Sequence, residues 1–316
     1  MNYPERLFTL TITGFTVLLG LAGLSACGGG NQTDHHSTGK LDIVCTTGMI
    51  GDLLENIGGD RVDVTSLMGP GVDPHIYKAS HGDVEQLAEA DIIFYNGLLL
   101  EGKMVDIFEK MSRRKPVIPV ARDIPEDSLI QPPEYEGNYD PHVWFDLDLW
   151  LQTIPVVVSH LTSRDSAGAD TYRENGRTYA QKLDSLDQWV HQRMQTIPKR
   201  QRVLVTAHDA FGYFGRAYGI KVVGLQGIST VAEFGVKDVR NLADLIVERK
   251  VNAIFVESSI PERPINAVKE ACRSRGFNVE IGGTLYSDAM GPAGSGADTY
   301  LTMVRHNVNT MVNALK

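Results

Sequence analysis

The sequence carries one tripeptide twice, as Asp73-Pro74-His75 and as Asp140-Pro141-His142, each followed two residues later by an aromatic side chain. Proline fixes its own φ and pushes the preceding residue into an extended conformation. Each histidine therefore belongs to a stiff stretch of chain, which suits a metal ligand because coordination geometry must be held closely. The repeat predicts two imidazole ligands of one metal site.

Two further positions could complete such a site. His208 follows the apolar run 203–205, and Asp288 follows the strand-like stretch 279–285. The four positions are separated by similar lengths of chain, about two βα units each. Ligands of open α/β sheets bind beyond the carboxyl ends of the strands. We therefore expect the four side chains to converge on one cleft.

Short apolar runs alternate with amphipathic stretches along most of the chain, which predicts parallel sheets covered by helices. The expected strands cover residues 40–46, 62–67, 91–95, 117–120, 203–205, 221–225, 253–256 and 279–281. The expected helices cover residues 49–57, 80–90, 102–111, 146–161 with a kink at Pro155, 211–218, 236–249, 265–275 and 299–315.

One stretch differs from this alternation. From 169 to 197 large side chains recur at threes, fours and sevens, which predicts a single amphipathic helix of roughly 40 Å with a weak point at Asn175-Gly176. The predicted architecture is two Rossmann-like α/β lobes with parallel sheets, joined by this one helix, with the metal site in the cleft between them. We expect the first lobe at 40–165, the linking helix at 166–198 and the second lobe at 199–316.

The N-terminus has the features of a secretory signal. Arg6 precedes an apolar stretch that ends in Leu24-Ser25-Ala26-Cys27, which resembles the cleavage box of bacterial lipoproteins. We expect residues 1–26 to be removed, Cys27 to carry a lipid, and residues 27–39 to form a flexible tether. The alternative, an N-terminal transmembrane anchor, is disfavoured by a short span rich in threonine.

Composition limits the remaining possibilities. At 316 residues the chain is long enough for two domains that each bury a core. Its net charge of −9 argues against binding to nucleic acid. Cys45 and Cys272 fall in different halves, so we expect two buried thiols, although an extracytoplasmic location would also permit a disulfide bond.

Other polar residues have ordinary explanations. Four histidines are expected to be surface or hydrogen-bonded residues: His81, His160, His191 and His306. His35 and His36 could hold metal weakly in the tether. Asp73 and Asp140 are either turn residues or carboxylates that orient an imidazole, and Glu257 could add charge to the cleft. Three aromatic residues are expected to pack around the site: Tyr77, Trp144 and Phe211.

Seven segments together resemble one family, the TroA-type metal-binding receptors (cluster A-I) of ABC importers, and the likeness extends from residue 40 to residue 316. The segments are 69–75, 94–98, 140–146, 205–214, 225–227, 257–261 and 286–291. The resemblance implies that His75, His142, His208 and Asp288 bind one Zn²⁺ or Mn²⁺. It also implies a monomeric lipoprotein, in the periplasm or at the cell surface, that delivers the ion to a permease and its ATPase.

The donor set fits either metal. Three imidazoles and a carboxylate suit Zn²⁺ and Mn²⁺, and the absence of a thiolate disfavours Cu⁺. Manganese relatives usually have glutamate where His208 stands, whereas zinc relatives often have a histidine-rich loop that the short stretch 122–139 lacks. Zinc should bind more tightly, because the site is rich in nitrogen.

Three other functions remain open from the sequence. A zinc hydrolase would use Asp209 or Glu257 as its general base and would need an open coordination position. An adhesin could use the same lobes and leaves no motif. Receptors for iron chelates or vitamin B12 share the single-helix linker but need roomier clefts.

Overall fold

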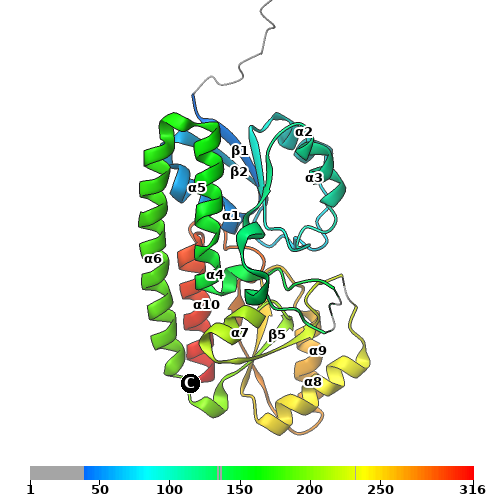
Figure 1. Cartoon of the computed structure of the whole chain (residues 1–316). Coiled ribbons are helices and arrows are strands. Elements are labelled where there is room, and N and C mark those ends of the chain that lie inside the picture. Colours follow the sequence, from blue (N-terminus) through cyan, green and yellow to red (C-terminus); the bar gives the residue numbers. More distant parts are fainter. Residues whose placement is uncertain (1–38, 134, 136, 232) are drawn as a thin grey trace, which may run out of the picture. The chain divides into compact units, whose positions relative to one another are not determined.

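The computed structural model describes residues 39–316 apart from 134, 136 and 232. The predicted signal peptide (1–26), the lipid on Cys27 and all but the last residue of the predicted tether (27–39) lie outside the described residues. Within them, no helix is both long and apolar enough to cross a membrane. The described part is an α/β structure with parallel sheets and one long helix, which confirms the predicted fold class (Figure 1).

The first lobe contains a four-stranded parallel sheet in the order β2-β1-β3-β4. Its elements are β1 (Leu41–Thr47), α1 (Gly48–Gly58), β2 (Val62–Met68), α2 (His81–Glu89), β3 (Ile92–Tyr95), α3 (Val105–Ser112), β4 (Val117–Pro119), α4 (Leu147–Leu151) and α5 (Thr153–Arg164). Successive side chains of a strand point to opposite faces. Ile43 of β1 accordingly packs with α1, and Val44 packs with α2 and α3. Both faces are covered, which explains why successive residues of β1, from Ile43 to Cys45, are apolar.

The second lobe repeats this plan with two parallel strand pairs. Its elements are β5 (Val203–His208), α7 (Gly212–Tyr218), β6 (Lys221–Gln226), α8 (Val236–Arg249), β7 (Ala253–Glu257), α9 (Arg263–Arg273), β8 (Glu280–Leu285) and α10 (Tyr300–Leu315). β5 pairs with β6, β7 pairs with β8, and β5 lies beside β7. Val205 faces α8 and α9, whereas Leu204 belongs to the core that includes α10.

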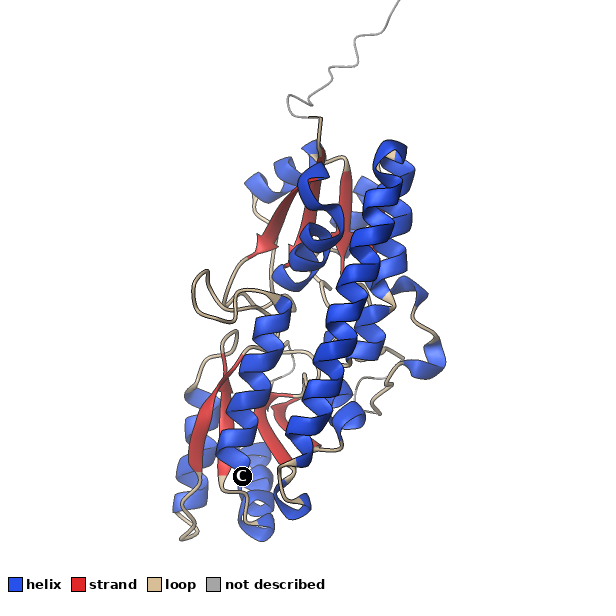
Figure 2. Cartoon of the chain, turned by 90° about the vertical axis from the view of Figure 1, so that its left-hand side faces the viewer, coloured by secondary structure: helices blue, strands red, loops and turns tan. Residues whose placement is uncertain are grey.

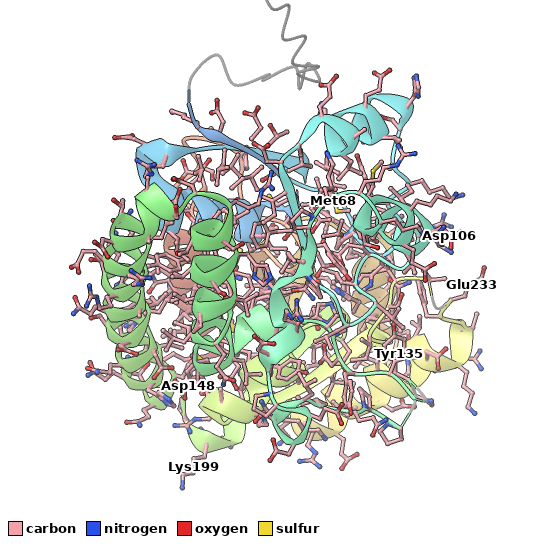
Figure 3. All side chains as sticks on the ribbon, turned by 45° about the horizontal axis from the view of Figure 1, so that its top comes forward. Met68, Asp106, Tyr135, Asp148, Lys199 and Glu233 are labelled. Atoms are coloured by element: carbon pink, nitrogen blue, oxygen red, sulfur yellow. The ribbon has the colours of Figure 1, made fainter. Side chains whose placement is uncertain are left out.

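Helix α6 (Ala169–Gln195) runs along both lobes (Figures 1 and 2). The side chains predicted to form its apolar stripe are buried: Tyr172, Tyr179, Leu183, Leu186, Val190 and Met194. They pack against α1 and α5 in the first lobe and against α10 in the second. One hydrophobic core therefore continues from the first sheet to the last helix. Acidic and basic side chains such as Asp106, Lys199 and Glu233 point outward from the surface (Figure 3).

Two local details add to the predictions. Helix α6 is a single helix, as predicted, and at its expected weak point Asn175 Nδ2 donates to the Ile57 carbonyl at 3.0 Å. Gly176 is there because α5 approaches closely: a Cβ atom would lie 3.0 Å from a Val158 methyl carbon. The predicted helix 146–161 is instead two helices that meet at Gln152. Pro155 lies in the first turn of α5, where its missing N–H costs no hydrogen bond, and the junction of the two helices falls three residues before it.

Candidate metal centre

His75 and His142 occupy equivalent turns in the first lobe. In each Asp-Pro-His tripeptide, the aspartate Oδ1 accepts the main-chain N–H of the histidine at 2.9 Å. This is the local bond by which aspartate stabilises a turn. Together with the fixed φ of proline it holds each histidine on a rigid corner, one between β2 and α2 and the other just before the short 3-10 turn Val143–Phe145. Both imidazoles are buried.

The second lobe supplies His208 and Asp288. His208 is the last residue of β5, where the strand passes into a loop, and its N–H donates to Glu257 Oε1 at 2.9 Å. Asp288 follows β8 by three residues. Both side chains are fully buried. They project from the carboxyl ends of β5 and β8, where ligands of parallel sheets bind.

The structure brings all four predicted residues together. Their nearest donor atoms lie within 4.8 Å of one another. His75 Nε2 and His142 Nε2 are 3.2 Å apart, His208 Nε2 lies 3.3 Å from Asp288 Oδ2, and His142 Nε2 lies 3.5 Å from Asp288 Oδ1. Zinc ligands lie about 2.0 to 2.1 Å from the ion, so tetrahedral neighbours are about 3.3 Å apart. The spacing therefore fits donors arranged around one small ion.

Asp288 provides an independent test of this fit. Among the described residues, neither of its carboxylate oxygens has a hydrogen-bond partner, although both are buried. A buried carboxylate without such partners is costly unless a cation balances it. Oδ1 faces His142 and Oδ2 faces His208 and, at 3.9 Å, His75. Both oxygens are thus directed at the point that the three imidazoles surround.

Two of the imidazoles are oriented by a second carboxylate. His142 Nδ1 lies 2.7 Å from Asp140 Oδ1, and His208 Nδ1 lies 2.6 Å from Glu257 Oε2. A carboxylate beside Nδ1 favours a hydrogen on Nδ1, which leaves Nε2 as the ring atom directed at the centre. Asp140, predicted as either a turn residue or an orienting carboxylate, makes both kinds of contact, and Glu257, predicted to add charge to the cleft, lies beside the His208 imidazole.

Asp73 behaves differently although its tripeptide is the same. Its Oδ1 holds the main-chain N–H of His75, and its Oδ2 accepts a hydrogen bond from Thr230 Oγ1 at 2.6 Å. Asp73 therefore acts as a turn residue and as a bond between the lobes, rather than as a partner of the imidazole. Sequence reasoning did not identify Thr230, which lies in the loop after β6 and belongs to no motif.

The charges in the cluster are strongly coupled. Burial lowers the pKa of His75 to about 3, with the neighbouring histidines adding to the effect and Asp288 opposing it. Burial also disfavours charge on His208, but Glu257 and Asp288 outweigh it and raise its pKa well above the ordinary value. The pKa of Asp288 is lowered: burial would raise it, but the histidines, His208 first, prevail. Burial therefore favours the neutral form of His75, whereas His208 and Asp288 favour the charged forms of each other.

The remaining histidines lie away from this cluster, as predicted. His81 pairs with Glu85, His160 Nδ1 donates to the Val156 carbonyl at 2.7 Å, His191 lies 3.6 Å from Asp187, and His306 Nε2 donates to the Thr284 carbonyl at 3.1 Å. His35 and His36 lie outside the described residues. Cys45 and Cys272 are buried free thiols, which confirms that prediction.

Aromatic packing encloses the site. The Trp144 ring centroid lies 5.2 Å from that of His142, and its Nε1 donates to the Ser287 carbonyl at 3.0 Å, next to Asp288. Phe211 stacks on Phe145 at 4.3 Å. Both were predicted to pack around the site. Tyr77 instead bonds through its hydroxyl to Asp83, in the capping box of α2.

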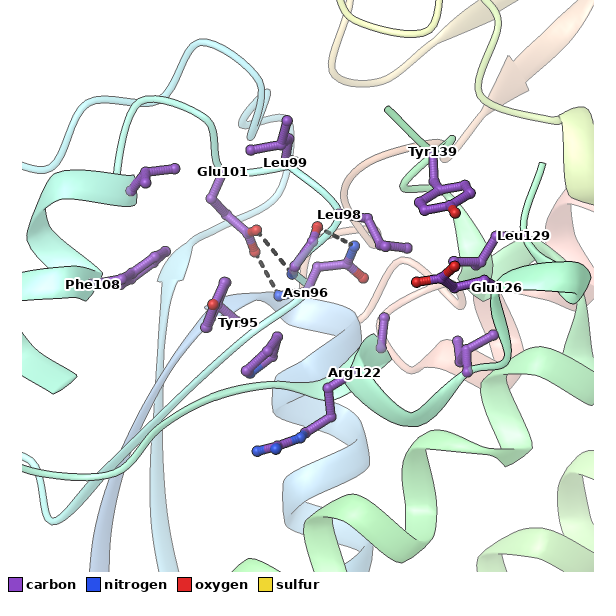
Figure 4. A pocket seen from close by; sticks show the side chains of 15 residues that line it. Tyr95, Asn96, Leu98, Leu99, Glu101, Phe108, Arg122, Glu126, Leu129 and Tyr139 are labelled. Atoms are coloured by element: carbon purple, nitrogen blue, oxygen red, sulfur yellow. Dashed lines mark hydrogen bonds between the residues drawn. The ribbon is translucent and has the colours of Figure 1, made fainter. Parts of the chain in front are cut away.

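One cavity borders the cluster, and another lies in the first lobe. One, of about 640 Å³, is lined by His75, Leu99, Gly102, Lys103, Tyr135, residues 227–229 and Val231. The other, of about 410 Å³, lies in the first lobe (Figure 4). Its wall includes the buried Glu101, which accepts hydrogen bonds from Thr46 and from the N–H groups of Asn96 and Gly97. Glu101 thereby fixes the loop whose Leu98 and Leu99 have positive φ.

Comparison with known proteins agrees with this architecture. The family model described as zinc-uptake complex component A, periplasmic, matches residues 43–314. The chain therefore belongs to this family of metal-binding proteins.

Three relatives illustrate the family. The chain is 47% identical to the manganese-binding lipoprotein MntA of Bacillus subtilis, covering 95% of this chain and 97% of that one. It is 45% identical to the zinc-binding protein TroA of Treponema pallidum, covering 96% and 94%. It is 30% identical to the manganese ABC transporter substrate-binding lipoprotein PsaA of Streptococcus mitis, covering 96% and 98%. The solved structure of the treponemal periplasmic zinc-binding TroA superposes with a TM-score of 0.85 at 47% identity, covering 88% of this chain and 99% of that one.

Proposed function

We propose that the protein is a receptor that binds one Zn²⁺ or Mn²⁺ outside the cytoplasmic membrane and delivers it to an ABC importer. The observation that carries the proposal is the closed cluster of His75, His142, His208 and Asp288, two donors from each lobe. Because ligands from both lobes meet on one ion, binding would stabilise their closed arrangement. Delivery needs no chemical step.

The donor set accommodates either metal. With both oxygens of Asp288 engaged, three imidazoles and one carboxylate would supply five donor atoms. MntA is named for manganese and TroA for zinc, and the chain is almost equally similar to both. The intrinsic order of metal affinities places Zn²⁺ above Mn²⁺ at such a site. We therefore expect tighter binding of zinc, whichever metal is transported.

The location and partners follow from the same comparison. MntA and PsaA are named lipoproteins, and PsaA is named as an ABC transporter component. These names support lipidation of Cys27 after removal of residues 1–26, and a position in the periplasm or at the cell surface. A permease and its ATPase would be the partners of a monomeric receptor. The proposed ranges are 27–39 for the tether, 40–165 and 199–316 for the lobes, and 166–198 for the linking helix.

A zinc hydrolase is the competing function with a definite structural requirement. It needs a coordination position that is open to water and substrate. His75 is 3% exposed and the other three donors are 0–1% exposed. Glu257 is bonded to His208 rather than free to act as a base. The geometry favours a receptor, and nothing in the structure singles out an adhesin.

Calorimetric titration of the chelator-stripped protein with Zn²⁺ and Mn²⁺ tests the proposal. We expect one tight site per chain, lost or greatly weakened in His208→Ala. The matched control is His191→Ala, which removes a histidine on the surface of α6 and should bind as the wild type does. Absence of a tight site, or full affinity in His208→Ala, would contradict the proposal.

A further inference from the structure

The bound ion would have one side on which it is least enclosed. Of the four proposed ligands, His75 is the one that lines the cavity of about 640 Å³. His142 and His208 are each backed by a carboxylate, and Asp288 adjoins Ser287, whose carbonyl is held by Trp144. An ion leaving the cluster would therefore pass His75 into this cavity.

The position of His75 depends on a hydrogen bond between the lobes. One carboxylate, that of Asp73, holds the His75 N–H at 2.9 Å with Oδ1 and the Thr230 hydroxyl at 2.6 Å with Oδ2. Thr230 belongs to the loop after β6, and residues 227–229 and 231 of that loop form part of the cavity wall. The Asp73 side chain thus connects His75 of the first lobe, by hydrogen bonds, to the second-lobe loop that lines the cavity into which the ion would leave.

Elsewhere the lobes are joined too extensively to separate easily. One hydrophobic core runs through α1, α6 and α10. The Tyr213 hydroxyl donates to the Asp140 carbonyl at 2.8 Å, and the Tyr300 hydroxyl donates to the Trp144 carbonyl at 2.6 Å, both across the lobes. Separating these buried contacts costs far more than breaking one half-buried hydrogen bond. Release of the ion is therefore expected to involve local movement of the His75 turn and the loop after β6, rather than separation of the lobes.

We propose that the Thr230–Asp73 hydrogen bond is a latch that slows release of the bound ion past His75. This inference rests on the proposed receptor function. Thr230 is a positioning residue: it touches no ion and acts through Asp73 on the main chain of His75. Without the hydroxyl, the loop after β6 is no longer hydrogen-bonded to the turn that carries His75, so the path from the ion past His75 into the cavity opens more often.

The test compares Thr230→Val, which keeps the shape and removes the hydroxyl, with Thr230→Ser, which keeps the hydroxyl. The purified full chain is loaded with Zn²⁺ and mixed with excess chelator, and the release rate is followed in a stopped-flow instrument. A hydrogen bond to a charged group is among the stronger ones. We expect Thr230→Val to release zinc on the order of tenfold faster, and Thr230→Ser to release it as the wild type does.

Thr196→Val is the matched control, because its hydroxyl bonds only within the turn that ends α6. The thermal midpoint of each metal-free variant checks that the fold is unchanged. A double-mutant cycle adds Thr230→Val to Asp73→Ala, where it should have no further effect, because the acceptor is already missing.

Two results overturn the latch while leaving the receptor function intact. One is wild-type release from Thr230→Val. The other is equally fast release from Thr230→Ser and Thr230→Val, which would mean that loop packing, not the hydroxyl, sets the rate. Failure of the wild-type chain to hold zinc at all would overturn both proposals.

Discussion

Replacing Glu257 with glutamine should weaken zinc binding without changing any proposed ligand. Glu257 Oε2 lies 2.6 Å from His208 Nδ1, and Oε1 accepts the His208 N–H at 2.9 Å, in a fully buried site. Glutamine has the same shape and can still accept the main-chain bond. It has no charge to polarise the imidazole, and its amide can turn a donor toward Nδ1.

Loss of such a partner typically costs a factor of 10 to 100 in metal affinity. That factor corresponds to about 1.4 to 2.8 kcal/mol, which agrees with the worth of a hydrogen bond to a charged group, about 1.5 to 3 kcal/mol. We therefore expect the zinc dissociation constant of Glu257→Gln to rise about 10- to 100-fold. Competition with a chelator of known affinity measures it.

The matched control is Glu280→Gln, which removes an exposed glutamate that pairs with Lys269 on the surface. It should bind zinc as the wild type does. If Glu257→Gln also retained wild-type zinc affinity, the Glu257 carboxylate would not be needed to orient and polarise the His208 imidazole, and the role proposed for it would be wrong.

Three further predictions concern protonation and packing. Because the pKa of His208 is raised well above its ordinary value while that of His75 is lowered to about 3, zinc binding should displace a proton from His208. Zinc affinity should therefore rise with pH up to the raised pKa of His208, and calorimetry of the wild-type protein in two buffers of different ionisation enthalpy should find about one proton released per zinc bound. A zinc affinity that does not change with pH, with no proton released, would contradict the assignment. Glu101→Ala should lower the free energy of unfolding by at least about 2 kcal/mol in urea titrations, because two main-chain N–H groups lose their buried acceptor. Replacing the exposed Glu126 with alanine should have little effect. Similar stability of the two variants would refute this prediction. Gly224→Ala would place a Cβ atom 2.5 Å from the Asp209 nitrogen and 2.6 Å from the His208 carbonyl carbon. The substitution should therefore cost about 1 to 3 kcal/mol of stability and weaken zinc binding, whereas the control Gly227→Ala should do neither. A stable Gly224→Ala variant with normal zinc affinity would contradict this prediction.

Much of the fold was predictable because its causes are local. Strands buried on both faces require apolar runs, and a helix that packs along one side requires side chains at threes and fours. The buried stripe of α6 from Tyr172 to Met194 follows this rule. The break at Gln152 did not show in the periodicity, because apolar residues continue through it. The close approach of α5 to Gly176 likewise depends on a segment that is distant in the sequence. From the sequence alone, this glycine is interpreted as a weak point of the helix rather than as a site of close helix packing.

In the site, too, features with local causes were predictable and features that depend on distant residues were not. Asp-Pro-His predicted both turns, since the proline and the aspartate act within three residues. Asp73 and Asp140 have the same sequence context but different second contacts, Thr230 for one and the His142 imidazole for the other. Thr230 is 157 residues from Asp73, and a lone threonine in a flexible-looking loop gives no signal. Only the folded arrangement distinguishes an orienting carboxylate from an interlobe bond.

The most direct test of the central claim is a crystal structure of the zinc-loaded protein with anomalous data collected on both sides of the zinc edge. We predict one strong anomalous peak per chain, about 2.0 to 2.2 Å from the Nε2 atoms of His75, His142 and His208 and from Asp288. A peak elsewhere, or one that lacks any of these four ligands, would contradict the account.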